Sequence, residues 1–255
     1  MFANYHTHTA RCHHATGEDK AYVEAAIQNG FQVLGFSDHC PWIFSDGYVS
    51  PIRMTPDELD GYVTSLTALK KEYAADITIY IGLESEYVPE MLPEQQKFLQ
   101  DYPIDYQILG EHFLYPEQHG IYTGRPTDDA AELKHYVDQV VAGMETGNYL
   151  YLAHPDLFHF IGDPALYEQE FRRLCVYLKE KQIPIEINQL GLADHRQYPN
   201  PAFLKIAESV GNTAIIGCDA HHPSALLDTD SQQACKKLAE QYHLPLVEVL
   251  PKLSR

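Results

Sequence analysis

The first stretch of the chain that could do chemistry is rich in histidine. Residues 5–14 read YHTHTARCHH and include His6, His8, His13 and His14. Imidazole nitrogens bind zinc, iron and manganese, whereas a histidine-rich turn at a protein surface needs no ion. The choice between these two interpretations depends on whether ligand-type residues recur at matching structural positions along the chain.

Short apolar runs alternate with longer segments of helical periodicity. Several runs are β-branched and nearly continuous, as expected for parallel strands covered on both faces. We expect strands at 2–5, 33–36, 77–83, 106–109, 149–153, 183–187 and 213–217, and helices near 19–29, 89–101, 127–146, 164–181, 200–209 and 231–241. A capping box of Thr55 and Glu58, with Pro56 at the first helical position, predicts a further helix there. This order predicts a βα barrel or a doubly wound sheet.

Ligand-type residues follow the expected strands at their carboxyl ends. Side chains two positions apart on a strand share a face, about 6–7 Å apart, so each HxH or DxH pair can point into one cavity. In a βα barrel this end of the strands is the functional face. One tetrahedral ion cannot use so many ligands, so we expect more than one ion. The residues at the strand ends are His6, His8, Asp38, His39, Glu84, His112, His154, Asp219 and His221.

Composition bounds the class of protein. A chain of 255 residues that is 45% hydrophobic suits a large core, and no linker divides it, so we expect a single domain over 1–255. The formal charge of -18 repels nucleic acid and anionic lipid. A cluster of cations would give this acidic protein a positive pocket for a phosphate ester. The sequence carries no signal for oligomeric state.

The chain shows no membrane or export signal. No apolar run approaches the roughly 18–20 residues of a membrane-spanning helix, and the first residues lack the layout of a signal peptide. We therefore expect a cytoplasmic protein. The five cysteines are odd in number, scattered and without a CxxC pair, which predicts reduced thiols.

Some candidates keep a structural alternative. Spacing does not decide between His13 and His14 as a ligand. Asp38 points to the opposite face from His39 in an extended strand, so it either orients a ligand or makes a structural hydrogen bond. Packed thiols are the better interpretation of Cys12 and Cys218, which lie beside expected ligands. The histidines that match no strand end, for which surface or supporting roles are expected, are His119, His135, His159, His195, His222 and His243.

The motifs together resemble a known family. HTHT at 6–9, SDH at 37–39, GLESEY at 82–87, GEHF at 110–113, AHPD at 153–156 and GCDAH at 217–221 occur in this order. The set resembles the polymerase-and-histidinol-phosphatase (PHP) superfamily. CHHATGE, PIRM at 51–54 and EINQLGL…YPNP at 186–201 resemble its histidinol-phosphate phosphatase branch.

The resemblance implies a fold and an activity. The fold would be α/β, a distorted seven-stranded (β/α)7 TIM-like barrel with three divalent metal ions. The activity would be hydrolysis of L-histidinol phosphate to L-histidinol and phosphate in histidine biosynthesis. We expect a metal-bridging hydroxide to attack phosphorus in line while the ions neutralise the phosphoryl oxygens. The metal could be zinc, iron or manganese, because histidine and carboxylate serve all three.

The resemblance also implies the ligand sets. The first ion would be held by His6, His8, Glu84 and Asp219, and Glu84 would bridge to a second ion held by His112 and His154. His14, six residues after His8, would join His39 and His221 around the third ion. Asp38, Arg53 and Arg196 are the other candidate catalytic residues. Of these, we expect Arg53 and Arg196 to contact the phosphate, because guanidinium binds phosphate bidentately.

One departure from the branch is visible. The branch typically continues N-T-x-G-L-R, whereas this chain has Gln189 in place of the threonine and Ala193 in place of the arginine. Arg196, three residues further on, would substitute for that arginine.

Three rival functions remain at the sequence level. The same site could act on a sugar phosphate, a nucleotide or a phosphotyrosyl protein. The chain could be a metal-binding PHP domain without activity, although its ligands are intact. An amidohydrolase-like barrel also carries an HxH motif, but its ligand order lacks the Glu84 bridge and the late DxH motif.

Overall fold

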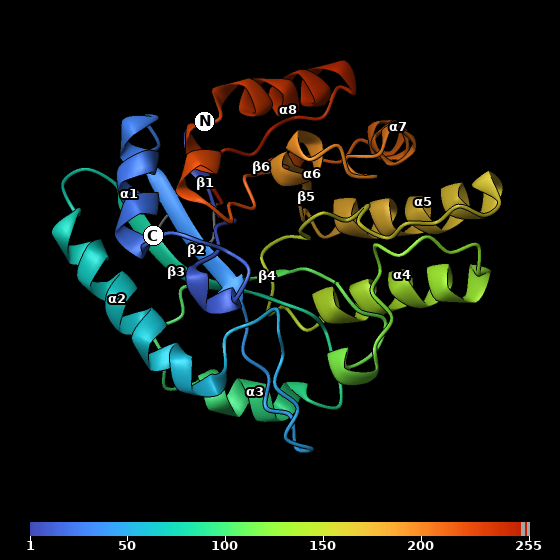
Figure 1. Cartoon of the computed structure of the whole chain (residues 1–255). Coiled ribbons are helices and arrows are strands. Elements are labelled where there is room, and N and C mark those ends of the chain that lie inside the picture. Colours follow the sequence, from blue (N-terminus) through green and yellow to red (C-terminus); the bar gives the residue numbers. More distant parts are fainter. Residues whose placement is uncertain (251–252, 254–255) are drawn as a thin grey trace.

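Parallel strands form a curled sheet inside a ring of helices (Figure 1). The computed structural model describes residues 1–250 and 253. Its strands are β1 (Ala3–Asn4), β2 (Val33–His39), β3 (Thr78–Ser85), β4 (Tyr106–Leu109), β5 (Ile185–Asn188) and β6 (Ala214–Gly217). The order β1-β2-β3-β4 makes one sheet and β5-β6 another, and every pair is parallel. The expected α/β class is confirmed, and within each sheet the strands have their carboxyl ends at the same edge.

The expected strand at 149–153 forms only isolated bridges. Leu152 makes one parallel bridge to Leu109 at the end of β4 and another to Ile185 at the start of β5. The Ala153 N–H donates to Leu109 (2.8 Å), and the Glu186 N–H donates to Leu152 (3.1 Å). The extended run then stops because His154 has a positive φ of 28°. The segment therefore connects the two sheets without a ladder of its own.

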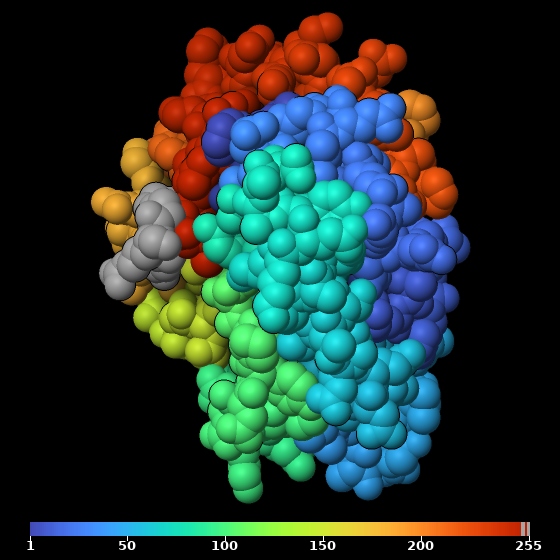
Figure 2. Space-filling model, turned by 90° about the vertical axis from the view of Figure 1, so that its left-hand side faces the viewer, coloured from blue at the N-terminus to red at the C-terminus, as the bar shows by residue number. Residues whose placement is uncertain are grey.

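The two ends of the strand series also meet. An isolated parallel bridge joins Thr7, just after β1, to Ala220, just after β6. The His8 N–H donates to the Ala220 carbonyl at 3.0 Å. In Figure 2, red atoms of the carboxyl-terminal part lie directly above blue atoms of the amino-terminal part. Segments from opposite parts of the chain thus lie side by side.

The helices begin where local sequence signals predict. Pro56 and the Thr55–Glu58 capping box precede the helix of the second crossover, with the Thr55 N–H donating to Glu58 Oε2 at 2.7 Å. Asp163 and Asn200 cap two others through their side chains, each followed by proline. The short helix after β5 was not expected from the sequence. The helices are α1 (Asp19–Gln28), α2 (Leu59–Glu72), α3 (Leu92–Leu99), α4 (Ala130–Glu145), α5 (Pro164–Glu180), α6 (Gln189–Ala193), α7 (Pro201–Val210) and α8 (Thr229–Gln241).

A buried tyrosine closes the space between the strands. The Tyr106 hydroxyl lies within hydrogen-bond distance of the Tyr5 carbonyl (2.7 Å) and the Phe36 carbonyl (3.0 Å). Its ring fits because Gly35 and Gly82 lack a Cβ, which would meet the Tyr106 side chain at 2.3 and 2.4 Å. This packed layer supports the strand ends from below.

Two further expectations concern bilayers and thiols. None of the helices in the described part of the chain combines the length and apolarity needed to cross a membrane. All five cysteines are free and buried, as the sequence predicted.

Candidate metal centre

The strand ends bring the predicted ligands to one place. His39 is the last residue of β2 and pairs in register with Glu84 of β3. His6 and His8 follow β1, and the other expected ligands follow β4, the 149–153 segment and β6. Because parallel strands end on the same side, residues far apart in the sequence converge there.

Glu84 lies at the centre of this cluster and is buried. Its Oε1 is 2.8 Å from His154 Nε2 and 3.5 Å from His112 Nε2. Its Oε2 is 3.4 Å from His6 Nε2 and 3.3 Å from His39 Nδ1. One carboxylate therefore faces histidines from four separate segments of the chain, which suits a group that bridges two ions.

Two further groups adjoin Glu84. His8 Nε2 is 3.1 Å from Asp219 Oδ1, and His6 Nε2 is 3.5 Å from the same oxygen. On the outer side, His221 Nε2 is 3.0 Å from His14 Nε2. The ligand atoms of His14, His39 and His221 lie within 4.8 Å of one another, as do those of His6, His8 and Asp219. Such distances allow one ion to be shared within each group.

Several atoms at the centre have no hydrogen-bond partner although they are buried. They are His6 Nε2, His8 Nε2, His39 Nδ1, His154 Nδ1 and Glu84 Oε2. Burying polar atoms without a partner costs about 1–3 kcal/mol each, and metal coordination removes that cost. Three of these nitrogens and the Glu84 oxygen face other candidate ligands. The residues present therefore fit divalent ions.

The second nitrogen of many of these rings is held by the protein. His6 Nδ1 lies 2.9 Å from Glu186 Oε2, and His112 Nδ1 lies 2.9 Å from Glu86 Oε1. His14 Nδ1 is 2.7 Å from the Cys12 carbonyl. Such partners fix the ring orientation and leave Nε2 free for an ion, which is the usual arrangement around metal-bound histidine.

Three groups at the centre have the charge states that metal ligands need. Burial alone would raise the pKa of the Glu84 carboxyl, but the imidazoles of His112 and His6 hold it well below its usual value. His6 and His8 lower the pKa of the Asp219 carboxyl in the same way. Burial and the neighbouring His8 lower the pKa of His221 to about 3. These groups are therefore anionic carboxylates and a neutral imidazole, the forms that coordinate metal.

A cavity of about 570 Å³ opens above the cluster, large enough for a small metabolite. Seven of the nine candidate ligands line it, all except His6 and His8, and most of its other lining residues are apolar or aromatic. The remaining lining residues are Ile52, Phe113, Tyr122, Leu157, Leu190, Asp194, Arg196 and Tyr198.

Comparison with known proteins identifies the family. The PHP domain family matches residues 4–190 of the chain. The chain belongs to the PHP domain family. A "Probable histidinol-phosphatase" of Deinococcus radiodurans is 28% identical over 230 residues, which cover 86% of this chain and 85% of that protein. The histidinol-phosphatase of Bacillus subtilis is 34% identical over 115 residues, 43% of each chain.

A solved structure shares the fold of this PHP domain. The histidinol phosphate phosphatase HisK of Lactococcus lactis, in complex with zinc, L-histidinol and phosphate, matches with a TM-score of 0.73 and 19% identity. The match covers 98% of this chain and 97% of that one. At this identity the likeness shows the fold.

Among the predicted residues, the structure separates His13 from His14. His14 enters the cluster, whereas His13 is exposed and lies 3.3 Å from Glu58 Oε2. His13 has φ of 68° and ends the short helical turn at 10–12, which points its side chain away from its neighbour's. Of the two histidines that spacing left open, His14 is therefore the one whose position suits a ligand.

Asp38 lies beside the cluster and outside the cavity lining. Its Oδ1 lies 3.4 Å from His8 Nδ1, and its Oδ2 accepts from the Thr9 N–H at 3.1 Å. It therefore orients a candidate ligand and makes a structural hydrogen bond as well, so the two expectations for this residue combine.

The two predicted arginines differ in position. Arg196 lines the cavity, with its side chain 39% exposed and its Nη2 2.9 Å from Asp194 Oδ2. Arg53 does not line it; the guanidinium is buried and bonded to Glu86 and Glu117. The expectation that Arg53 reaches phosphate does not fit this geometry, because its donors already serve two carboxylates.

Sequence reasoning missed the acids that support the histidines. Glu186 lies inside β5, and Glu86 lies two residues beyond Glu84 on the same face. A signal existed for the first: an acidic residue in an otherwise apolar, buried strand needs a partner. The six histidines expected to have other roles are absent from the lining of the cavity, within the described residues.

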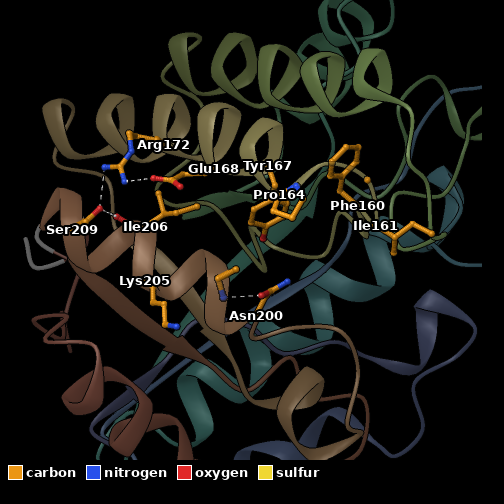
Figure 3. Close-up of a pocket in the computed structure, with 12 residues that line it drawn as sticks. Phe160, Ile161, Pro164, Tyr167, Glu168, Arg172, Asn200, Lys205, Ile206 and Ser209 are labelled. Atoms are coloured by element: carbon orange, nitrogen blue, oxygen red, sulfur yellow. Dashed lines mark hydrogen bonds and ion pairs between the residues drawn. The ribbon is translucent and has the colours of Figure 1, made fainter.

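A second cavity, of about 440 Å³, lies between α5 and α7 (Figure 3). Arg172 there bonds Glu168 (2.9 Å) and the Ser209 hydroxyl (3.0 Å). Its other lining residues are largely apolar, and it shares no residue with the cavity above the metal centre.

Proposed function

We propose that this PHP domain is a metal-dependent phosphomonoesterase that hydrolyses L-histidinol phosphate to L-histidinol and phosphate. The observation that carries the proposal is the buried cluster of histidines around Glu84, which contains several unpartnered polar atoms and adjoins a metabolite-sized cavity. The Deinococcus and Bacillus relatives carry the name histidinol-phosphatase, and the Lactococcus structure holds histidinol and phosphate. These relatives favour histidinol phosphate among possible esters.

The donor set supports three divalent ions. Three groups correspond to the sets expected from the sequence: His6/His8/Asp219, Glu84/His112/His154 and His14/His39/His221. Glu84 belongs to the second group and also faces His6 and His8 of the first. Zinc is the ion named in the Lactococcus structure, and iron or manganese would suit the same nitrogen and oxygen donors. When bound, the ions would neutralise phosphoryl charge and lower the pKa of water toward 7.

The other residues of the cavity would bind and orient the ester. Arg196 presents a guanidinium at the wall and would contact phosphate oxygens. Ile52, Phe113 and Leu157 line the cavity with apolar surface that excludes water from the bound ester. Asp38 holds the His8 ring, so it acts as a positioning residue rather than on the substrate itself.

We also propose that the strand series closes as a seven-stranded barrel in one domain over 1–255. The bridges of Leu152 to both neighbouring strands and of Thr7 to Ala220 support this, because they connect the two sheets on both sides. A closed arrangement would hold all three ligand groups at one rim.

A substrate panel tests the activity. Protein loaded with zinc, manganese or, without oxygen, ferrous iron is assayed on L-histidinol phosphate, a sugar phosphate, a nucleotide and a phosphotyrosyl peptide. We expect kcat/KM for histidinol phosphate to exceed that of every other ester by at least about tenfold, equivalent to 1.4 kcal/mol.

Two variants serve as controls for the panel. Asp219→Asn, purified identically, measures contaminating phosphatase and should be inactive. His243→Ala replaces a histidine that is paired with Glu208 outside the centre and should retain activity. A better ester than histidinol phosphate would overturn the substrate assignment, and metal-loaded protein without activity on any ester would instead show a non-catalytic metal-binding domain.

A further inference from the structure

Among the described residues with less than 2% of their surface exposed, Arg53 has the largest side chain. Its Nη1 and Nη2 donate to the two oxygens of Glu86, each at 2.9 Å. Its Nε donates to Glu117 Oε2 at 2.6 Å, and Nη1 also lies 3.2 Å from the Cys40 carbonyl. The guanidinium is therefore fixed between two buried carboxylates and has no face toward the substrate cavity.

Glu86 connects this arginine to the metal centre. Its Oε1 accepts from Arg53 Nη2 and lies 2.9 Å from His112 Nδ1. Its Oε2 accepts from Arg53 Nη1 and from Trp42 Nε1 (3.1 Å). Both oxygens thus have two partners, and the carboxylate plane is fixed. The other nitrogen of the His112 ring, Nε2, faces Glu84 at 3.5 Å.

Glu117 attaches the same arginine to two loops. Besides Arg53, it accepts from the Ser50 hydroxyl at 2.7 Å and the Tyr48 hydroxyl at 3.0 Å. These two residues precede Arg53, and Glu117 follows His112 by five positions. The contacts hold the 48–53 segment against the segment that carries His112.

We propose that Arg53 is a positioning residue that fixes the His112 ring for metal binding through Glu86, and that it does not contact the phosphate. The inference rests on the metal centre of the proposed function. Without the guanidinium, Glu86 and Glu117 would be buried charges that have lost their cation, which is strongly unfavourable. Glu86 would then no longer be held in its present orientation, and His112 would lose the acceptor that orients its ring.

Metal titration of variants tests the role. We compare wild type, Arg53→Lys, Arg53→Gln and Glu86→Gln by metal content per chain and by the free zinc concentration that gives half-maximal phosphatase activity. Loss of a residue that supports a metal-bound histidine typically weakens metal affinity or activity 10- to 100-fold. In all three variants we expect the free zinc concentration needed to bind one of the ions to rise by about that factor. At saturating zinc, kcat should recover substantially and KM should stay near the wild-type value.

Arg173→Gln is the matched control. Arg173 also bridges two carboxylates, Glu170 at 2.7 Å and Asp138 at 2.8 Å, but on the exposed surface of α5. It should leave the zinc dependence unchanged. Arg53→Gln leaves two buried carboxylates without their cation, so thermal unfolding is measured for every variant. If Arg53→Gln does not fold, Arg53→Lys and Glu86→Gln test the positioning role.

The double variant Arg53→Lys/Glu86→Gln shows whether the two residues act together. If Arg53 works through Glu86, the loss of zinc affinity in the double variant will be smaller than the two single losses combined. An unchanged zinc dependence with a raised KM at saturating metal would overturn the inference and restore the phosphate contact. Wild-type protein that binds no metal would reject the proposed metal centre instead, so the two failures are distinguishable.

Discussion

Replacing Arg196 by alanine tests whether the cavity wall binds phosphate. The guanidinium lines the cavity, and its Nη1 lies 3.3 Å from the Tyr198 hydroxyl, while its Nη2 donates to Asp194. A hydrogen bond to a charged group contributes about 1.5–3 kcal/mol. Because the side chain is 39% exposed, solvent screening favours the lower part of that range, about 1.5–2 kcal/mol. At 1.36 kcal/mol per tenfold, Arg196→Ala should lower kcat/KM about 10- to 30-fold.

The assay separates phosphate binding from other effects. The inhibition constant of inorganic phosphate is measured beside kcat and KM for histidinol phosphate, because phosphate lacks the alcohol part of the substrate. Both the inhibition constant and KM should rise in Arg196→Ala, and Arg196→Lys should recover part of the loss. Metal content should not change, since Arg196 contacts none of the candidate ligands through a hydrogen bond in the described structure.

Arg172→Ala is a closely matched control. Arg172 bonds a carboxylate and a hydroxyl, as Arg196 does, and its side chain is 43% exposed, but it lies at the cavity between α5 and α7. Arg172→Ala should leave kcat, KM and the phosphate inhibition constant unchanged. If Arg196→Ala changed the phosphate inhibition constant by less than about threefold, or no more than Arg172→Ala does, the assignment of Arg196 to phosphate would be refuted.

Two other predictions concern the metal centre. Glu84→Gln should lose bound metal and reduce kcat at least about 100-fold, beyond the range for supporting residues, because an amide nitrogen replaces one of two oxygens that together face five histidines. Replacement of the exposed Glu94 by glutamine is the control, and metal content and activity are measured for both variants. Treatment with a chelator should abolish activity and lower the melting temperature, since ions bound only by the native state stabilise it by about 4 kcal/mol at a thousandfold excess over Kd. Chelation should become easier as pH falls through the ordinary histidine pKa of about 6.5, because protons then compete for the imidazole nitrogens; retention of metal at pH 5 would contradict this.

The placement of the ligands was predictable, and some of their neighbours were not. Strand periodicity and the HxH and DxH spacings were enough to bring His6, His8 and His221 to one rim. Sequence spacing could not choose His14 over His13, because the choice depends on the left-handed backbone of His13. Such a conformation is unusual for a residue other than glycine and follows from the surrounding structure.

Arg53 shows why substrate contacts were harder to predict. Its residue type suits phosphate, but its partners Glu86 and Glu117 lie in other segments of the chain, and only the fold reveals that they use its donors. The strand expected at 149–153 failed for a comparable reason. Apolar content predicts an extended buried segment there, whereas only the fold shows that it makes a single bridge to each neighbouring strand, both through Leu152.

The bridge between Thr7 and Ala220 has a consequence for how the protein matures in the cell. His6 and His8 leave the ribosome first, but Asp219 and His221 must be synthesised before the ligand group that unites them exists. Contacts between such distant parts of a chain form late in folding, because long loops must close first. Metal binding at the proposed centre would therefore be a late event of biogenesis, and a nascent or truncated chain that stops before residue 219 could not assemble the group of His6, His8 and Asp219.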